Sequence, residues 1–336
     1  MKMFTTLIFI FLSKLSFSYY SGTLIDAHSQ VRCDTKPNQV IKLIKNSDVD
    51  YVLLSAGGCY KKEKYFSKKH SQRLINSIKG KSKIFLLNGL KQATNGKKKS
   101  VNKKRNIFKK ILNYGQSNNA VGSAEILIQH AVWDDPRLKT SGVDLSLSDE
   151  LVRFYVNNLV KNNHPVILHI EAKDAEHKSE QTLLDLEELL ALHQNHPFIL
   201  IHMGQLSPTQ VGHLISNHKN IFFLTSMSDG QFQIVAKRKS MNTQNGWISV
   251  FDTSSNNHKE HINSLSWKNE WRELFDKHSS RFILAFDNVF IGNWKKRNPR
   301  SIKIWRKALS QLKSNSAKNI ACFNANKMWN LGVNCK

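Results

Sequence analysis

The stretch Val166-Ile-Leu-His-Ile170 is apolar except at its histidine, and Phe198-Ile-Leu-Ile-His202 repeats the pattern further along the chain. Neither stretch alternates polar with apolar residues, so each predicts a strand that is buried on both faces. Strands of this kind are typical of a parallel sheet that helices cover on both sides. The two stretches therefore indicate an α/β fold.

Comparable strand-like runs occur throughout the chain, each bounded by polar or glycine-containing segments. In order they are Thr23–Asp26, Tyr51–Ser55, Lys83–Leu87, Ala120–Leu127, Val166–Ile170, Phe198–His202, Ile221–Thr225 and Phe282–Phe286. Helical patterns follow them at Gln39–Asn46, Lys68–Lys79, Val101–Asn113, Leu147–Asn162, Glu180–His193, Pro208–Asn217, Trp267–Lys277 and Ser301–Leu312. Eight βα units predict a (β/α)8 TIM barrel, with residues 19–336 as a single domain.

An open doubly wound sheet is the alternative, but no Gly-rich phosphate loop follows any of the runs. The polar segment Ser226–Leu265 lies between the seventh and eighth runs. Barrel enzymes place a lid or a substrate loop in such a position. We therefore expect an extended loop between strands seven and eight.

The composition is that of a globular protein. Of the 336 residues, 40% are hydrophobic and 22% are charged, which excludes wholesale disorder and a collagen-like fibre. Lys and Arg total 50 against 25 for Asp and Glu, a formal net charge of +25. Such a charge attracts polyanions and membrane surfaces without specifying any of them, and a compositional bias of the source is the other explanation.

The densest basic cluster lies in Lys97–Lys110. It predicts either a solvated loop and helix face or a patch for anionic glycans, lipids or nucleic acid, with non-specific contact to anionic envelope polymers. It lacks interleaved aromatic residues, so no specific nucleic-acid partner is expected.

The amino terminus has the order of a secretory signal peptide. Lys2 precedes an apolar stretch that ends at Leu12, and Ser16 and Ser18 provide a small-residue cleavage site. The stretch is too short to cross a bilayer core, which takes about 20 residues. We therefore predict that residues 1–18 are a signal peptide and that the protein is exported, periplasmic or secreted. An uncleaved amino-terminal anchor is the alternative.

Export would permit disulfides among the four cysteines, Cys33, Cys59, Cys322 and Cys335. Cys322 and Cys335 could staple the tail, whereas Cys33 and Cys59 follow the first two predicted strands. Their spacings are not those of zinc sites. Pairing and buried free thiols both remain open.

Polar side chains gather at the carboxyl ends of the predicted strands, where barrels of this kind place their chemistry. They are His28 and Gln30, Glu125, His169 and Glu171, His202, and Asp287. One histidine alone would more often be a satisfied core residue. Imidazoles and carboxylates at several strand ends instead predict a site for one divalent metal ion, Zn²⁺ or Mn²⁺.

The chain resembles the amidohydrolase superfamily, in its amidohydrolase-related branch of metal-dependent hydrolases. The resemblance runs from about Leu24 to Leu331. The motifs that carry it are Ile25-Asp-Ala-His28, Pro165-Val-Ile-Leu-His169, Ile201-His-Met-Gly204, Phe286-Asp-Asn288 and the tail Ala317–Leu331. It implies a TIM-barrel enzyme in which a metal-activated water attacks an amide, ester, lactone or phosphoester bond of a small molecule.

The resemblance also implies a role for each position. The metal ligands would be His28, Glu125, His169, His202 and Asp287. Asp287 would in addition shuttle the proton of the attacking water. Gln30 stands where the family usually has a second histidine, which favours a single ion over a pair. Gln30 and Glu171 are expected to contact substrate.

Two other functions stay open. One is a catalytically weak or inactive barrel that binds an anionic envelope ligand, a reading that Gln30 and the positive charge favour. The other is a metal-dependent decarboxylase or lyase. A serine hydrolase is disfavoured because no Gly-x-Ser-x-Gly elbow occurs.

Overall fold

A computed structural model describes residues 19–57, 68–90, 100–130, 143–171, 179–238, 247–253, 255 and 257–336. The predicted signal peptide lies outside these residues, as do Cys59 and Lys97–Lys99 of the basic cluster. Within the described residues, none of the helices has the length and apolar character needed to cross a membrane.

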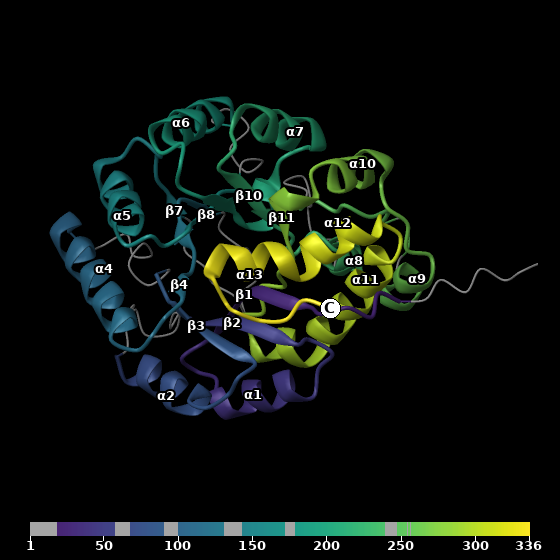
Figure 1. Cartoon of the computed structure of the whole chain (residues 1–336), viewed down its shortest axis with the longest axis horizontal. Helices are drawn as coiled ribbons and strands as arrows, with labels where there is room; N and C mark the ends of the chain where they lie inside the picture. The colour runs from purple at the N-terminus through teal and green to yellow at the C-terminus, as the bar shows by residue number, and fades with distance from the viewer. Residues whose placement is uncertain are drawn as a thin grey trace, which may run out of the picture.

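Two parallel sheets form the centre of the molecule (Figure 1). The first contains β1 (Ile25–Val31), β2 (Tyr51–Ala56), β3 (Ile84–Asn88) and β4 (Gly122–Ser123). The second contains β5 (Ile126–Leu127), β8 (Val166–His169), β9 (Phe198–Leu200), β10 (Ile221–Leu224) and β11 (Phe282–Ile283). Neighbouring strands follow chain order and pair in parallel, which confirms the predicted α/β class and strand order.

The predicted closed barrel is not formed as one continuous sheet by the described residues. The single strand predicted at Ala120–Leu127 divides, so that β4 pairs with β3 whereas β5 pairs with β8. The division falls at Ala124, whose N–H donates back to the carbonyl of Asn88. The two sheets are therefore separate ladders, joined by the short stretch that carries Glu125.

The other junction lies between β11 and β1. Leu284 follows β11, and its N–H donates to the carbonyl of Ile320 in the carboxyl-terminal helices rather than to a strand. The segment still reaches β1, because Ala27 N–H donates to Leu284 O at 3.0 Å and Asp287 N–H donates to His28 O at 2.8 Å. These bonds bring the predicted site residues of the two segments together without a regular strand pair.

Helices surround the sheets (Figure 1). Those that follow the strands are α1 (Pro37–Lys45), α2 (Lys68–Ile78), α4 (Val101–Gln116), α5 (Glu150–Lys161), α6 (Ser179–Leu192), α7 (Pro208–Asn217), α10 (Asn269–Lys277) and α11 (Asn298–Leu309). All eight helical patterns predicted from the sequence are present. The described part of Ser226–Leu265 contains two further helices, α8 (Gln231–Arg238) and α9 (His258–Asn263), so the segment is not a simple extended loop.

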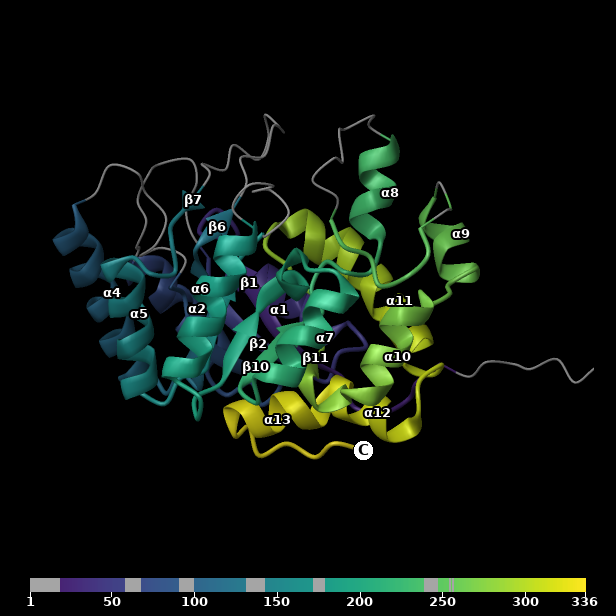
Figure 2. The same cartoon turned by 90° about the horizontal axis from the view of Figure 1, so that it is seen from above.

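The apolar core has an inner and an outer part. The inner cluster takes small and branched side chains from nearly every strand: Ile25, Ala27, Leu53, Leu87, Ile167, Ile199, Leu224 and Ile283. Trp329 of α13 (Asn324–Trp329) packs on it near Gly122, where an added Cβ would lie 2.8 Å from the indole. Figure 2 shows α13 and α12 (Ser314–Lys318) at the opposite end of the molecule from α8. The carboxyl-terminal helices thus close the amino ends of the strands.

Cys322 and Cys335 form a disulfide that ties the tail to this inner cluster. Cys33 is also disulfide-bonded. Pairing, which the sequence left open beside free thiols, is thus found for these three cysteines.

The described part of the basic cluster lies on α4, away from the strand ends. Lys103, Lys109 and Lys110 are exposed there, and Arg105 pairs with Glu150 of α5. These residues face solvent, which agrees with both alternatives that the sequence left open.

Candidate active site

A bulge in β1 places His28. Between Asp26 and Ser29 three steps along β1 match only two along β2, so the register shifts at Ala27 and His28. A bulge bends a strand and re-aims a side chain. It also turns the main chain of Ala27 and His28 toward the Leu284–Asp287 segment, with which both form backbone hydrogen bonds. The His28 side chain is fully buried as a result.

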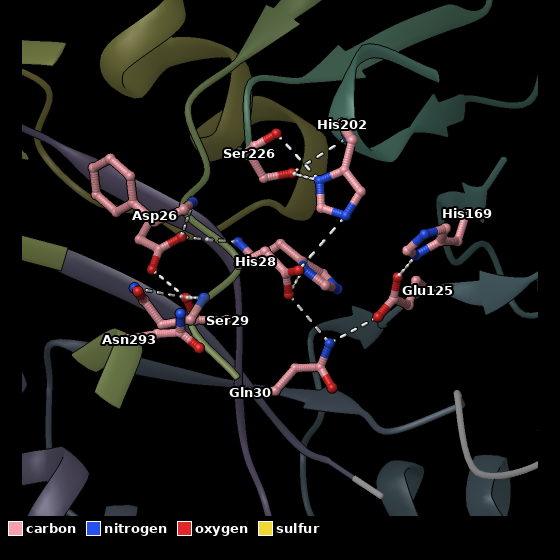
Figure 3. A network of polar contacts seen from close by, with 12 residues as sticks. Asp26, His28, Ser29, Gln30, Glu125, His169, His202, Ser226 and Asn293 are labelled. Carbon is pink, nitrogen blue, oxygen red and sulfur yellow. Dashed lines mark hydrogen bonds and ion pairs between the residues drawn. The ribbon is translucent and has the colours of Figure 1, made fainter. Parts of the chain in front are cut away.

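The Asp26 carboxylate links β1 by hydrogen bonds to the segment that follows β11 (Figure 3). It accepts hydrogen bonds from the Ser29 hydroxyl at 2.5 Å, from Phe286 N–H at 2.9 Å and from His28 N–H at 3.3 Å. The Ser29 oxygen in turn accepts Asn288 N–H at 3.0 Å. Burial raises the pKa of Asp26 to about 6, against the opposing hydrogen bonds from Ser29, Phe286 and His28. Asp26 therefore fixes where His28 and Asp287 lie relative to each other.

Asp287 has a φ of 47°, in the left-handed region that few residues other than glycine adopt. The Arg297 guanidinium supports this turn by donating to the carbonyl of Asp287 at 2.6 Å and to that of Phe286. In this position Asp287 Oδ1 lies 3.4 Å from His28 Nδ1, and Oδ2 lies 3.6 Å from His202 Nε2. The carboxylate is thus held between two imidazoles.

Gln30 connects this group to the other strand ends. Its Nε2 donates to Glu125 Oε1 at 2.7 Å and to Asp287 Oδ1 at 3.3 Å. Glu125 Oε2 lies 2.5 Å from His169 Nδ1, and His169 Nε2 lies 2.9 Å from Glu171 Oε1. The side chains of Gln30, Glu125 and His169 can be followed in Figure 3.

His202 lies just beyond its strand. β9 ends at Leu200, two residues before the predicted end, and His202, Met203 and Gly204 have φ values of 55°, 57° and 63°. This turn directs the ring inward, where Nδ1 lies 2.9 Å from Ser226 Oγ and 3.1 Å from Ser226 O. Nε2 is left facing Asp287. The structure thus brings all seven predicted site residues into one buried network.

The buried histidines of this network differ in their affinity for a proton. Burial lowers the pKa of His202 to about 3, aided by the neighbouring charge of His169. Burial also acts against protonation of His169, but Glu125 and Glu171 outweigh it and raise its pKa to about 9. The pKa of His28 is likewise raised, because Asp287 and Glu125 outweigh burial. The neighbouring carboxylates thus favour the protonated forms of His169 and His28.

The network contains the kinds of ligand atom that bind a divalent cation. His28 Nε2 is buried and has no hydrogen-bond partner among the described residues, although buried polar atoms usually have one. Imidazole nitrogens and carboxylate oxygens are the ligands that zinc and manganese prefer. A cation would neutralise the carboxylates in place of the protons on the histidines, since metal binding requires neutral imidazole.

A second group of ligand atoms adjoins the first. His130, His169 and Glu171 each offer an atom that lies within 4.8 Å of the others. His130, at the end of β6 (Gln129–His130), was not among the predicted residues. Its signal in the sequence was weak, because it stands three residues beyond the predicted fourth strand. The short antiparallel pairing of β6 with β7 (Val143–Asp144) brings its backbone to the site.

A cavity of about 430 Å³ adjoins the network. His169, Glu171, His202 and Asp287 contribute to its wall. Glu171 lines the cavity, and its contact with substrate stays a prediction. Gln30 does not line the cavity, because its amide is held between the carboxylates of Glu125 and Asp287.

No protein-family model and no curated protein matches the chain. Among solved structures, an amidohydrolase from Burkholderia multivorans with bound HEPES has a TM-score of 0.52 at 11% identity, covering 92% of this chain and 99% of that one. A second crystal form of that amidohydrolase, with bound zinc, has a TM-score of 0.51 at 11% identity, and the match covers 92% of this chain and 99% of that one. A proposed 2-pyrone-4,6-dicarboxylic acid hydrolase from Pseudomonas putida has a TM-score of 0.51 at 9% identity, and the match covers 93% of this chain and 99% of that one. These likenesses confirm the resemblance to the amidohydrolase superfamily at the level of the fold.

The role of Asp26 can be tested by Asp26→Asn. The amide would leave at least one buried donor without an acceptor, so the free energy of unfolding should fall by about 1–3 kcal/mol. Because His28 and Asp287 would lose their common anchor, zinc affinity should fall as well. Asp50→Asn is the matched control, since the Asp50 carboxylate also accepts a backbone N–H of this region, that of Leu24, away from the site. Urea unfolding and zinc titration would check both, and equal zinc affinities for the two variants would contradict the assignment.

Proposed function

We propose that this chain is a metal-dependent hydrolase of the amidohydrolase type that acts on a small molecule. One observation carries the proposal. Side chains from separate strand ends, predicted as a set from the sequence, meet in one buried network that opens on a cavity. The amidohydrolase fold neighbours support it, and so does the zinc bound to one of them.

We assign the ion to the network side chains. His28, Glu125, His169, His202 and Asp287 would hold it, and His130 and Glu171 offer the adjoining ligands. When bound, a divalent ion lowers the pKa of its water to about 7 and polarises a carbonyl or phosphoryl oxygen.

Asp287 is the proposed proton carrier. Its pKa lies below the ordinary value, because the interactions with His28 and His202 outweigh burial, so the carboxylate is ionised at neutral pH. It also lines the cavity, within reach of a substrate there. It would accept the proton of the attacking water and return it to the leaving group of an amide, ester, lactone or phosphoester.

Gln30 is the reason for proposing one metal ion rather than two. Its amide donates to both Glu125 and Asp287 and thereby already eases the repulsion between these two carboxylates. A neutral amide is also a weaker zinc ligand than imidazole. We therefore propose a single ion.

We also propose that the protein is exported. The disulfide between Cys322 and Cys335 and the disulfide-bonded state of Cys33 support this, because disulfides persist in oxidising compartments. Outside the cytoplasm the many cationic side chains would meet anionic envelope polymers.

Export predicts a processed amino terminus in the native host. Mass spectrometry of the protein from that host should find a mature start near Tyr19, because Ser16 and Ser18 form the small-residue cleavage site. An intact Met1 in a cytoplasmic fraction would refute the proposal.

The metal site predicts the zinc content of three variants. Gln30→His should raise metal occupancy, because imidazole replaces the amide. His169→Ala should weaken zinc binding by at least about tenfold, a loss seen even for outer partners of metal ligands. His164→Ala is the control, since this half-buried histidine lies near the amino end of the same strand and contacts Ser123. Metal analysis after purification without chelator, with zinc or manganese added, would measure all three.

A wild-type protein that binds neither zinc nor manganese, together with an equally empty Gln30→His variant, would overturn the hydrolase proposal. The non-catalytic binding barrel would then take its place.

Turnover should depend on Asp287. Once a screen of esters, lactones and phosphoesters has found a substrate, Asp287→Asn should lower kcat by at least about 100-fold, because it keeps the shape and loses the base. Asp252→Asn, at an exposed carboxylate, should keep full activity. Circular dichroism would confirm that both variants are folded. Activity of Asp287→Asn within a few-fold of wild type would remove Asp287 from the chemistry.

A further inference from the structure

Three basic side chains line the cavity beside the network. Lys296 and Arg297 lie at the end of η5 (Asn293–Arg297), and Arg300 follows in the first turns of α11. No part of the proposed hydrolysis uses Lys296 or Arg300. The proposed hydrolysis therefore does not explain why these two side chains line the cavity.

The acids that line the cavity are already engaged. Asp287 lies between His28 and His202, and Glu171 contacts His169. The Asp229 carboxylate accepts hydrogen bonds from Gln231 at 2.8 Å and from Ser301. None of these carboxylates neutralises the cations of η5 and α11.

Lys296 and Arg300 form no hydrogen bond and no ion pair within the described part of the chain. Arg297 donates to two carbonyls, but its Nε is buried and has no partner among the same residues. A cavity wall with unpaired Lys and Arg donors is suited to an anionic group, which both side chains bind by charge-assisted hydrogen bonds.

The rest of the wall is largely apolar and aromatic. The Trp247 ring lies 5.0 Å from that of Phe232 and 5.1 Å from that of His202, measured between centroids. Val289 and Phe290 add apolar surface next to η5. Small-molecule sites combine such apolar walls with a few placed polar groups, in cavities of about 300–1,000 Å³. The cavity of about 430 Å³ therefore suits a compact ligand with an apolar body.

We propose that this cavity binds a small organic anion, with its apolar or aromatic body against Phe232 and Trp247 and its anionic group on Lys296 and Arg300. The anionic group is a carboxylate or a phosphate. The inference rests on the proposed function only in making this anion the substrate, whose scissile bond would then lie toward Asp287. Binding of the anion itself does not require turnover.

Binding of model ligands tests the proposal. Isothermal titration calorimetry of the full chain would compare benzoate and phenyl phosphate with benzamide, their neutral counterpart. At least one anion should bind about tenfold more tightly than benzamide, as expected when two partly exposed charges each add up to about 1 kcal/mol. The two anions distinguish a carboxylate site from a phosphate site.

Two double variants separate local contact from overall charge. Lys296→Gln with Arg300→Gln should reduce the affinity for the preferred anion to that for benzamide and leave benzamide binding unchanged. Lys295→Gln with Lys303→Gln removes the same charge from exposed positions of the same two elements that do not line the cavity. This control pair should retain the wild-type preference. If the first double variant does not fold, Lys296→Gln alone replaces it and should show a smaller loss of affinity for the anion.

Several results would overturn the proposal. They are equal binding of anions and benzamide, binding of none of the three ligands, equal losses in the two double variants, and an anion preference that chelator treatment abolishes. Its failure is distinguishable from that of the proposed function. Selective anion binding without hydrolysis of any substrate would leave the anion site in place and remove the hydrolase. Hydrolysis of a substrate by a protein that binds benzoate, phenyl phosphate and benzamide equally would do the reverse.

Discussion

The buried carboxylate of Asp26 is the constraint on which the rest of the site depends. It accepts donors from β1 and from Phe286, two segments that lie at opposite ends of the chain and form no regular strand pair. A charged group is costly to bury unless it is fully hydrogen-bonded, so these donors and the carboxylate hold one another in place. The bulge in β1 and the left-handed turn at Asp287 lie on the two sides of this contact. His28 and Asp287 become neighbours for that reason.

The second determinant is electrostatic. Glu125, Glu171 and Asp287 are all buried, the Gln30 amide donates to two of them, and together they raise the pKa values of His169 and His28. A bound metal ion would take the place of protons on these histidines, since metal binding requires neutral imidazole. The same arrangement explains why the free cations of η5 and α11 matter. They lie beyond the acids, in the wall of the cavity, where no carboxylate of the described residues competes for them.

Much of this could be predicted from the sequence, and the reason is physical. Strands such as Val166–His169 are buried on both faces, so they stand out as unbroken apolar runs, and parallel order brings their carboxyl ends together. His28, His169, His202 and Asp287 could be assigned to one site on that basis alone. The burial of these residues and their contacts in one network agree with that prediction.

What the sequence could not reveal depends on tertiary contacts. The division of the fourth strand at Ala124 follows from a hydrogen bond to Asn88, and the inward turn at His202 follows from Ser226. Neither partner is near in sequence. His130 reaches the site through the β6 and β7 pairing, and Lys296 and Arg300 reach it because α11 packs beside the cavity. No local pattern distinguishes these cations from the many other basic residues.

The most direct test of the central claim is X-ray absorption spectroscopy of the zinc-loaded protein at the zinc edge. The account predicts a first shell of nitrogen and oxygen only, at about 2.0–2.2 Å, with the outer-shell scattering of imidazole. A weaker imidazole contribution in His169→Ala, with the rest of the scattering retained, would identify His169 as one of the ligands. Sulfur at about 2.3 Å, or a first shell of water oxygens alone, would contradict a metal centre built from these strand ends.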